Sequence, residues 1–451
     1  MVGASLSRWT LAYFGCALSW LLAGEALLVA GFGYPVATLA APETLIVVHI
    51  VAIGWLSLLV CGALFQFVPV LVAGKLMSAG LAAIALPVLN IGLICLVCGF
   101  AGLAGLIPTP GMALPIGGLL LLFGFCLAGI SLAHTLWAAR PLAMPARFVV
   151  LGIAGLLVTA LLGNVFALAL SGVLGGELPL ALLLNGVPLH AAFGLGFWLS
   201  IVAVGVSYRL FAMFLLAPDA DARTMRRVLV AAGVAMVLLA AGIVVIVAMQ
   251  REAQLLLGLA GLASLVAIGL YVSDIARLHR TRKRRQIELN MQAALIAVAM
   301  LVLASLLLVV VLAIGQLDAH IGAVVYLFAF GWLGGLGLAK LYKIVPFITW
   351  LECYAPLLGK QPTPRVQDLV DERRARPWFA LYFLAVLAAT AMLLLGWAPA
   401  FRLAALMQLA ATLGLVRHFY LARRLGAVPT PQRHGARPRL FYVNVTARTP
   451  T

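Results

Sequence analysis

Residues 44–71 read TLIVVHIVAIGWLSLLVCGALFQFVPVL and contain no lysine, arginine, aspartate or glutamate. A helix rises about 1.5 Å per residue, so a stretch of this length crosses the roughly 30 Å hydrocarbon core of a bilayer. Apolar runs of similar length recur along the whole chain, which is 65% hydrophobic and 10% charged. Soluble globular domains do not have this composition. The sequence therefore predicts an all-α integral membrane protein.

About twelve transmembrane helices are predicted in one membrane domain, 1–424, followed by a mobile basic cytoplasmic tail, 425–451. The expected spans are 9–31, 44–71, 78–106, 112–138, 147–171, 187–215, 228–249, 253–277, 289–315, 320–346, 378–397 and 402–423.

The basic residues indicate the orientation of these spans. Of the 30 lysines and arginines, all but Arg251 and Arg402 fall on one side of the predicted topology. Because Lys and Arg collect on the cytoplasmic side, both termini are predicted to be cytoplasmic and the chain to lie in the cell inner (plasma) membrane. The net charge of +17 then requires no nucleic-acid partner, and the expected partner is the lipid bilayer. No disulfide framework is expected from the six cysteines.

A motif recurs in every fourth span, always on a helix predicted to run from outside to inside. Its members are Trp55, Trp198 and Trp332, each followed by Leu and then Ser or Gly, and, eleven residues after each tryptophan, Gln66, Arg209 and Lys343. The repeat predicts three related four-helix arcs, roughly 9–138, 147–277 and 289–423. The alternative is that small and aromatic residues merely pack helices closely. For Arg209 and Lys343, snorkelling to the interface and anion recognition are both open.

Three histidines lie toward the outer ends of the repeat-bearing spans. His49, His190 and His320 precede their tryptophans by six, eight and twelve residues, so His49 and His190 match best in depth. A buried neutral imidazole suits an axial haem ligand or a copper or zinc ligand. A hydrogen bond to a neighbouring helix or to interfacial water is the alternative. All three are candidate cofactor ligands, and His190 and His320 are also candidate metal ligands.

Glu25 is an isolated acidic residue inside the first span. An ionisable residue at such depth is by default a functional hypothesis, here a proton carrier or a partner for a buried polar group, and a structural hydrogen bond is equally open. Cys95 and Cys98 have soft-metal spacing but lack a second pair, which favours buried thiols. The chain contains no phosphate-binding loop, nucleophile triad or zinc-protease helix, which argues against a hydrolase or an ATP-driven pump.

The stretches HIVAIGW (49–55), GALFQFVP (62–69) and LYKIVPF (341–347) resemble catalytic subunit I of haem-copper oxidases and nitric oxide reductases, and are most similar to the cbb-type branch. The resemblance implies that His49 is an axial ligand of a low-spin b-type haem. It also implies that His190 occupies the place of the copper ligand on the sixth helix.

Two departures from this family affect the expected activity. Residues 225–249 and 326–347 contain no histidine, so the family's other copper ligands are missing and no complete binuclear oxygen-reducing centre is expected. The first hypothesis is an oxidase-subunit-I-like protein that binds b-type haem, or haem and copper, near the outer face. Its role would be electron transfer, gas or redox sensing, or support of a respiratory redox partner, and any enzymatic activity would be that of a membrane oxidoreductase.

The second hypothesis belongs to another class of membrane protein. It is a cofactor-free transporter or channel for a small molecule, a metal or haem, with Glu25 and the outer histidines lining the path.

Overall fold

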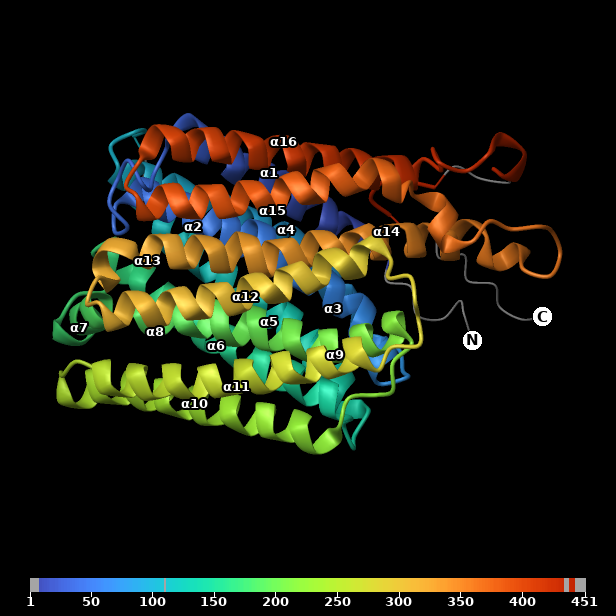
Figure 1. The fold of residues 1–451 in the computed structure, drawn as a ribbon. Coiled ribbons are helices and arrows are strands. Elements are labelled where there is room, and N and C mark those ends of the chain that lie inside the picture. The colour runs from blue at the N-terminus through green and yellow to red at the C-terminus, as the bar shows by residue number, and fades with distance from the viewer. Residues whose placement is uncertain (1–7, 109–110, 434–437, 443–451) are drawn as a thin grey trace. The chain divides into compact units, whose positions relative to one another are not determined.

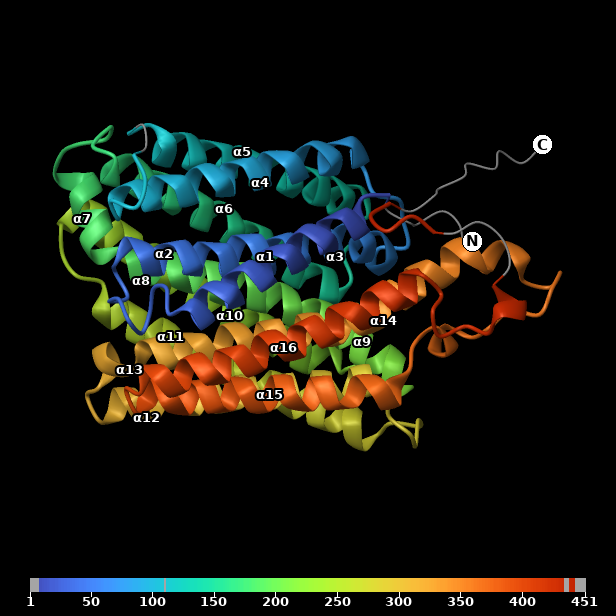
Figure 2. The same cartoon turned by 90° about the horizontal axis from the view of Figure 1, so that it is seen from above.

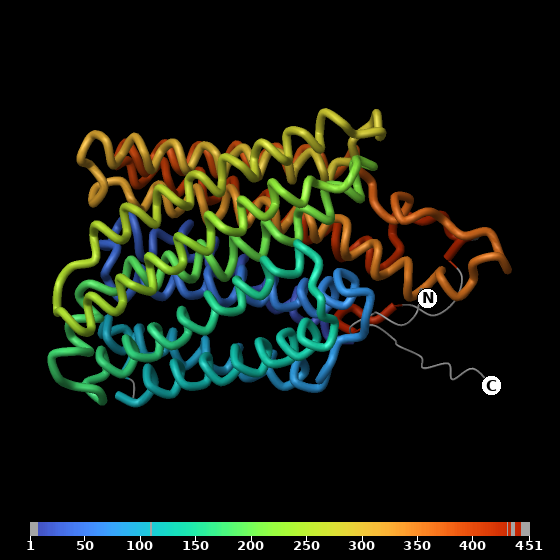
Figure 3. Tube along the Cα trace, turned by 90° about the horizontal axis from the view of Figure 1, so that it is seen from below, coloured from blue at the N-terminus to red at the C-terminus, as the bar shows by residue number. Residues whose placement is uncertain are grey.

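The computed structural model describes residues 8–108, 111–433 and 438–442, and no strand occurs in these ranges. Within these described ranges, twelve helices are long and apolar enough to cross a membrane, which confirms the predicted all-α membrane fold. In Figure 3 these helices appear as long coiled segments joined mostly by short loops.

Nine spans are single α-helices: α1 (Thr10–Ala30), α4 (Ala79–Leu103), α5 (Ala113–Ala138), α6 (Met144–Leu170), α10 (Ala222–Met249), α11 (Gln254–Arg280), α12 (Leu289–Ala313), α15 (Glu372–Leu394) and α16 (Ala398–Arg423). The other three are composite: α2 (Pro42–His49), η1 (Ile50–Ser57) and α3 (Leu58–Leu71); α8 (Val187–Ala191), η2 (Ala192–Ile201) and α9 (Val202–Leu215); α13 (Leu317–Tyr326), η3 (Leu327–Gly334) and α14 (Gly335–Cys353). Between the spans lie the short helices α7 (Glu177–Asn185), η4 (Ala355–Leu357) and η5 (Val366–Leu369), and η6 (Thr430–Gln432) follows the last one.

The chain divides into two compact units. Unit 1 comprises Met1–Leu39, Cys61–Val70 and Glu288–Thr451, and unit 2 comprises Ala40–Val60 and Leu71–Ile287. The third predicted arc falls within unit 1 and the second within unit 2, whereas the first is divided between them. The arrangement as three arcs stays a prediction.

In unit 1, α16 packs along both α15 and α1, and α12 packs against η3 and α14 (Figure 1). Leu425 and Val428, at the start of the predicted tail, are buried in a small cluster with Tyr354 and Leu369. Residues 434–437 and 443–451 lie outside the described residues, so the predicted mobility of the tail is untested there.

In unit 2, α4 lies beside α5 and α5 contacts α6 (Figure 2), and α10 pairs with α11 (Figure 1). Glycines permit the close approach of α4 and α5. A Cβ added to Gly117 would come within 2.6 Å of the backbone nitrogen of Leu96, and one on Gly99 within 2.8 Å of that of Leu114. Membrane helices associate largely through such close packing, because lipid supplies no hydrophobic drive between them.

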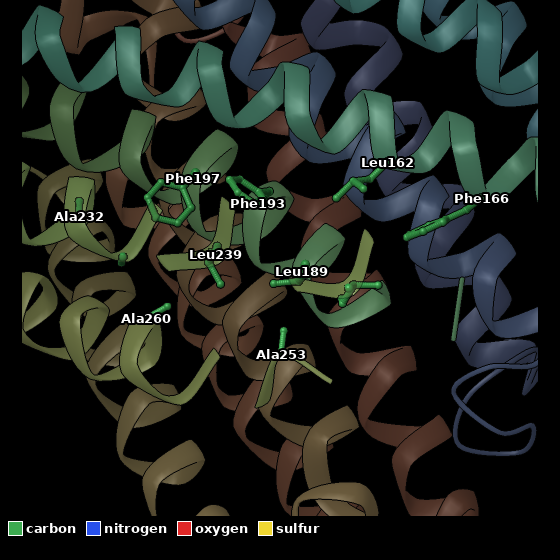
Figure 4. Close-up of a cluster of buried hydrophobic side chains, with 11 residues drawn as sticks. Leu162, Phe166, Leu189, Phe193, Phe197, Ala232, Leu239, Ala253 and Ala260 are labelled. Carbon is green, nitrogen blue, oxygen red and sulfur yellow. The ribbon is translucent and has the colours of Figure 1, made fainter. Parts of the chain in front are cut away.

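A core of buried side chains joins α6, α8, η2, α10 and α11 within unit 2 (Figure 4). Leu189 and Phe193 are fully buried in it, and Phe166 lies at its edge. This packing fixes the helix segment that carries His190, the residue after Leu189.

Candidate functional site

Three spanning helices contain a π-helical segment, and they are the helices that carry the sequence repeat. The segments η1, η2 and η3 each include the repeated tryptophan and end two or three residues after it, at Ser57, Ile201 and Gly334. π-Helical segments are rare, and they occur frequently at functional sites. The π-helical segments and the sequence motif therefore coincide in these three helices.

The repeated tryptophans are buried anchors of these segments. Trp55, Trp198 and Trp332 are at most 2% exposed. Within unit 2, the Ser57 hydroxyl donates to the Ala52 carbonyl at 2.7 Å and accepts a hydrogen bond from Trp198 Nε1 at 3.0 Å. The second and sixth spanning helices are therefore joined by a buried polar contact beside their π-helical segments.

His49 is the last residue of α2 and directly precedes η1. Its Nδ1 lies 2.7 Å from the Leu45 carbonyl oxygen. A carbonyl only accepts, so Nδ1 carries the proton and Nε2 presents a lone pair. The imidazole also packs on the Phe100 ring of α4, with 5.2 Å between centroids. A ring held through one nitrogen, with the other unprotonated, has the arrangement of a ligating histidine.

His190 lies two residues before η2, and its ring packs against α6. A Cβ at Gly163 would lie 2.9 Å from His190 Cε1, so the glycine makes room for the imidazole. Phe166 meets the ring edge-on at 5.5 Å. The Nδ1 atom is buried and has no hydrogen-bond partner, an arrangement that costs about 1–3 kcal/mol unless a partner binds there.

The structure places His49 and His190 in one compact unit, and their shared depth in the membrane stays a prediction. Both belong to unit 2, and their side chains are close enough to interact electrostatically. His320 belongs to unit 1 and lies seven residues before η3. Its Nδ1 is also buried without a partner.

The donor set limits which cofactor fits. Among the described residues, no group of three or more His, Cys, Asp or Glu side chains could hold a metal ion. Structural zinc sites take four protein ligands and catalytic ones three. A haem needs no more than two axial ligands, so a pair of imidazoles with available nitrogens fits a haem better than a zinc ion.

The three residues eleven positions after the tryptophans have different environments. Gln66 is 7% exposed. Arg209 forms an exposed ion pair with Asp219 at 3.3 Å, and Lys343 a largely buried one with Glu288 at 2.6 Å. Both cations are thus paired with carboxylates of the chain itself, which weakens the expectation that they recognise an anion.

Glu25 is 1% exposed and lies in a polar network that sequence reasoning missed. Its partners are Gln408 and Thr412 of α16, and Gln408 in turn binds Tyr326 of α13. Gln408 and Thr412 are four residues apart in an apolar helix, so they share one face. That spacing was a readable signal of a polar site on this span.

A comparison with protein-family profiles finds no match, and neither does a comparison with curated proteins. The function of the chain is therefore inferred from its residues and their geometry.

Proposed function

We propose that this chain is a divergent oxidase-subunit-I-like membrane protein that binds b-type haem through His49 and His190. One observation carries the proposal: two imidazoles of one compact unit each have a ring nitrogen that can ligate a metal. In His49 this is Nε2, because Nδ1 faces the Leu45 carbonyl, and in His190 it is the buried Nδ1 without a hydrogen-bond partner. Haem bound there would supply one-electron transfer at its iron.

The surrounding residues have defined tasks in this proposal. The Leu45 carbonyl keeps the proton of His49 on Nδ1 and makes Nε2 a better donor to a metal. Phe100 and Phe166 cover the two rings with apolar surface, which limits access of water. Gly163 allows His190 to approach α6. These contacts hold both imidazoles in place, as ligation requires.

The proposed role is electron transfer, gas or redox sensing, or support of a respiratory redox partner. Oxygen reduction by a binuclear haem-copper centre is not proposed, because 225–249 and 326–347 contain no histidine to complete it. From the charge asymmetry we further propose an inner-membrane location with both termini in the cytoplasm.

A pyridine haemochrome assay combined with copper quantification tests the proposal on detergent-purified wild-type protein. We expect b-type haem at about one per chain after expression with ample haem supply. Protein that holds copper but no haem would move the proposal to a two-histidine copper site. Protein that holds neither would overturn it.

A second function is a cofactor-free transporter or channel, and the observation favouring it is the buried, unpaired carboxylate of Glu25. This reading expects colourless protein that moves protons or metal ions across proteoliposome membranes, with transport lost in Glu25→Gln. A Soret band together with no transport would exclude it.

A further inference from the structure

Glu25 lies inside unit 1 in an unusual hydrogen-bonding environment. Its Oε1 atom accepts hydrogen bonds from Gln408 Nε2 and Thr412 Oγ1, each at 2.9 Å. The Tyr326 hydroxyl donates to Gln408 Oε1 at 2.6 Å, which fixes the orientation of the amide with its NH₂ group toward Glu25. The other carboxyl oxygen, Oε2, is buried and has no hydrogen-bond partner. The two oxygens of one carboxyl group are thus strongly unequal.

No basic side chain compensates Glu25 among the ion pairs of the described residues. The titratable groups that face it are the phenols of Tyr326 on α13 and Tyr382 on α15, both of which interact with it electrostatically. Arg402 of α16 is a basic residue on a helix that packs against α1. Its Nε donates to the Val29 carbonyl at 2.9 Å, and no ion pair with Glu25 is formed.

In unit 1, α3 also contacts α1. It meets α1 near the first turns of α1, where Thr10 donates to the Gly62 carbonyl and Tyr13 packs on Phe65. These contacts lie three turns or more along α1 from Glu25, and they bring no cation to it.

Glu352 provides a comparison within the same unit. Its side chain is 6% exposed, and its carboxylate pairs with the Arg423 guanidinium at 3.0 Å. A carboxylate taken out of water is stable when it is paired in this way, whereas an isolated one is not and becomes neutral instead. Glu352 is therefore suited to the charged form, and Glu25 to the neutral form.

We infer that Glu25 is a proton-binding site, a neutral carboxylic acid with its proton on Oε2. Protonation adds H⁺ to the carboxylate and forms the O–H bond at Oε2, and release leaves an anion whose Oε1 keeps its two donors, Gln408 and Thr412. A proton needs only one oxygen, whereas a metal cation needs several. Among the described residues, Glu25 belongs to no group of three or more His, Cys, Asp or Glu side chains that could hold a metal ion. The site lies in unit 1 and is independent of the proposed haem site.

Labelling with dicyclohexylcarbodiimide, located by mass spectrometry on the intact wild-type protein, tests the inference. This reagent modifies protonated carboxyl groups in apolar surroundings. We expect Glu25 to be labelled at neutral pH, with labelling lost as the pH rises and unchanged by sodium chloride. Glu352, largely buried but paired, should stay unlabelled. Protection of Glu25 by sodium ions would overturn the inference in favour of a cation site.

If Glu25 is not labelled, an infrared spectrum can still show whether its side chain is protonated. A carbonyl band of a protonated carboxylic acid should be present in the wild type and missing in Glu25→Gln. Absence of both the label and the band would overturn the inference, and it would leave the haem proposal untouched because neither measurement involves haem.

Variants of the hydrogen-bond donors test the assignment of the proton to Oε2. Gln408→Leu and Thr412→Val each remove a donor that stabilises the anion, so labelling of Glu25 should persist to higher pH in both. Thr390→Val removes a buried hydroxyl that donates to the Val386 carbonyl and not to Glu25. It is the matched control, with an unchanged pH profile expected. Labelling lost at lower pH in the donor variants would contradict the assignment.

Discussion

The second and sixth spanning helices differ from the tenth although all three carry the same backbone feature. In the first two, a histidine stands within two residues of the π-helical segment and a serine follows the tryptophan by two positions. In the tenth, His320 stands seven residues away and Gly334 replaces the serine. The three copies of the repeat therefore share the π-helical backbone at the tryptophan. They differ in the position of the histidine and in the residue two positions after the tryptophan.

The two units also differ in the ionisable side chains that they contain. Unit 2 contains two imidazoles, His49 and His190, and no ion pair among the described residues includes either. Unit 1 places carboxylates in its interior. Glu352 has a cationic partner, whereas Glu25 has none among the residues that the structure describes. Ligand binding is therefore expected in unit 2 and proton binding in unit 1.

The largest expected effect is on haem retention, and it separates the sixth helix from the tenth. His190→Ala removes one proposed axial ligand, so the purified protein should lose most of its haem or hold it in a high-spin form. His320→Ala should retain a wild-type spectrum. Absorption spectroscopy on matched preparations measures the haem content of both variants. Equal loss of haem in the two would contradict the distinction between these helices.

The next effect compares the two buried glutamates of unit 1. Glu352→Gln leaves the Arg423 charge buried without its counter-ion, which should destabilise the protein by about 3–5 kcal/mol. Glu25→Gln removes no ion pair and should change stability by less than about 1 kcal/mol. Thermal unfolding in detergent measures both, and a larger loss in Glu25→Gln would show that Glu25 is charged.

A smaller effect is expected at the polar contact beside η1. Ser57→Ala deprives the buried Trp198 indole of its acceptor, at a cost of about 1 kcal/mol. Trp198→Phe on its own and the double variant complete a thermodynamic cycle. A coupling energy near zero would mean that the bond does not stabilise the second and sixth helices against each other.

The smallest effect compares the cations that follow the repeated tryptophans. Arg209→Ala breaks an exposed pair and should change stability by at most about 1 kcal/mol. Lys343→Ala should cost more, because its pair with Glu288 is mostly shielded from water. Unfolding midpoints of the two variants measure the difference, and the reverse order would be contrary to their burial.

Hydropathy predicted the twelve spans because each must be long and apolar throughout. The number of residues between each histidine and its tryptophan also predicted that His49 and His190 lie at a similar depth in the membrane. The π-helical segments were not predictable, since lengthening the backbone hydrogen bonds by one residue requires no distinct composition. The partners of Glu25 come from α13 and α16, about three hundred residues or more along the chain, and hydrophobic periodicity does not encode such pairings. The Arg209 and Lys343 ion pairs were likewise invisible without the fold.

A reduced-minus-oxidised absorption spectrum of wild type, His49→Ala and His320→Ala tests the central proposal most directly. The proposal predicts a b-type spectrum in wild type and in His320→Ala, and a spectrum that is absent or high-spin in His49→Ala. No haem in wild type after expression with ample haem supply, or a loss confined to His320→Ala, would contradict it.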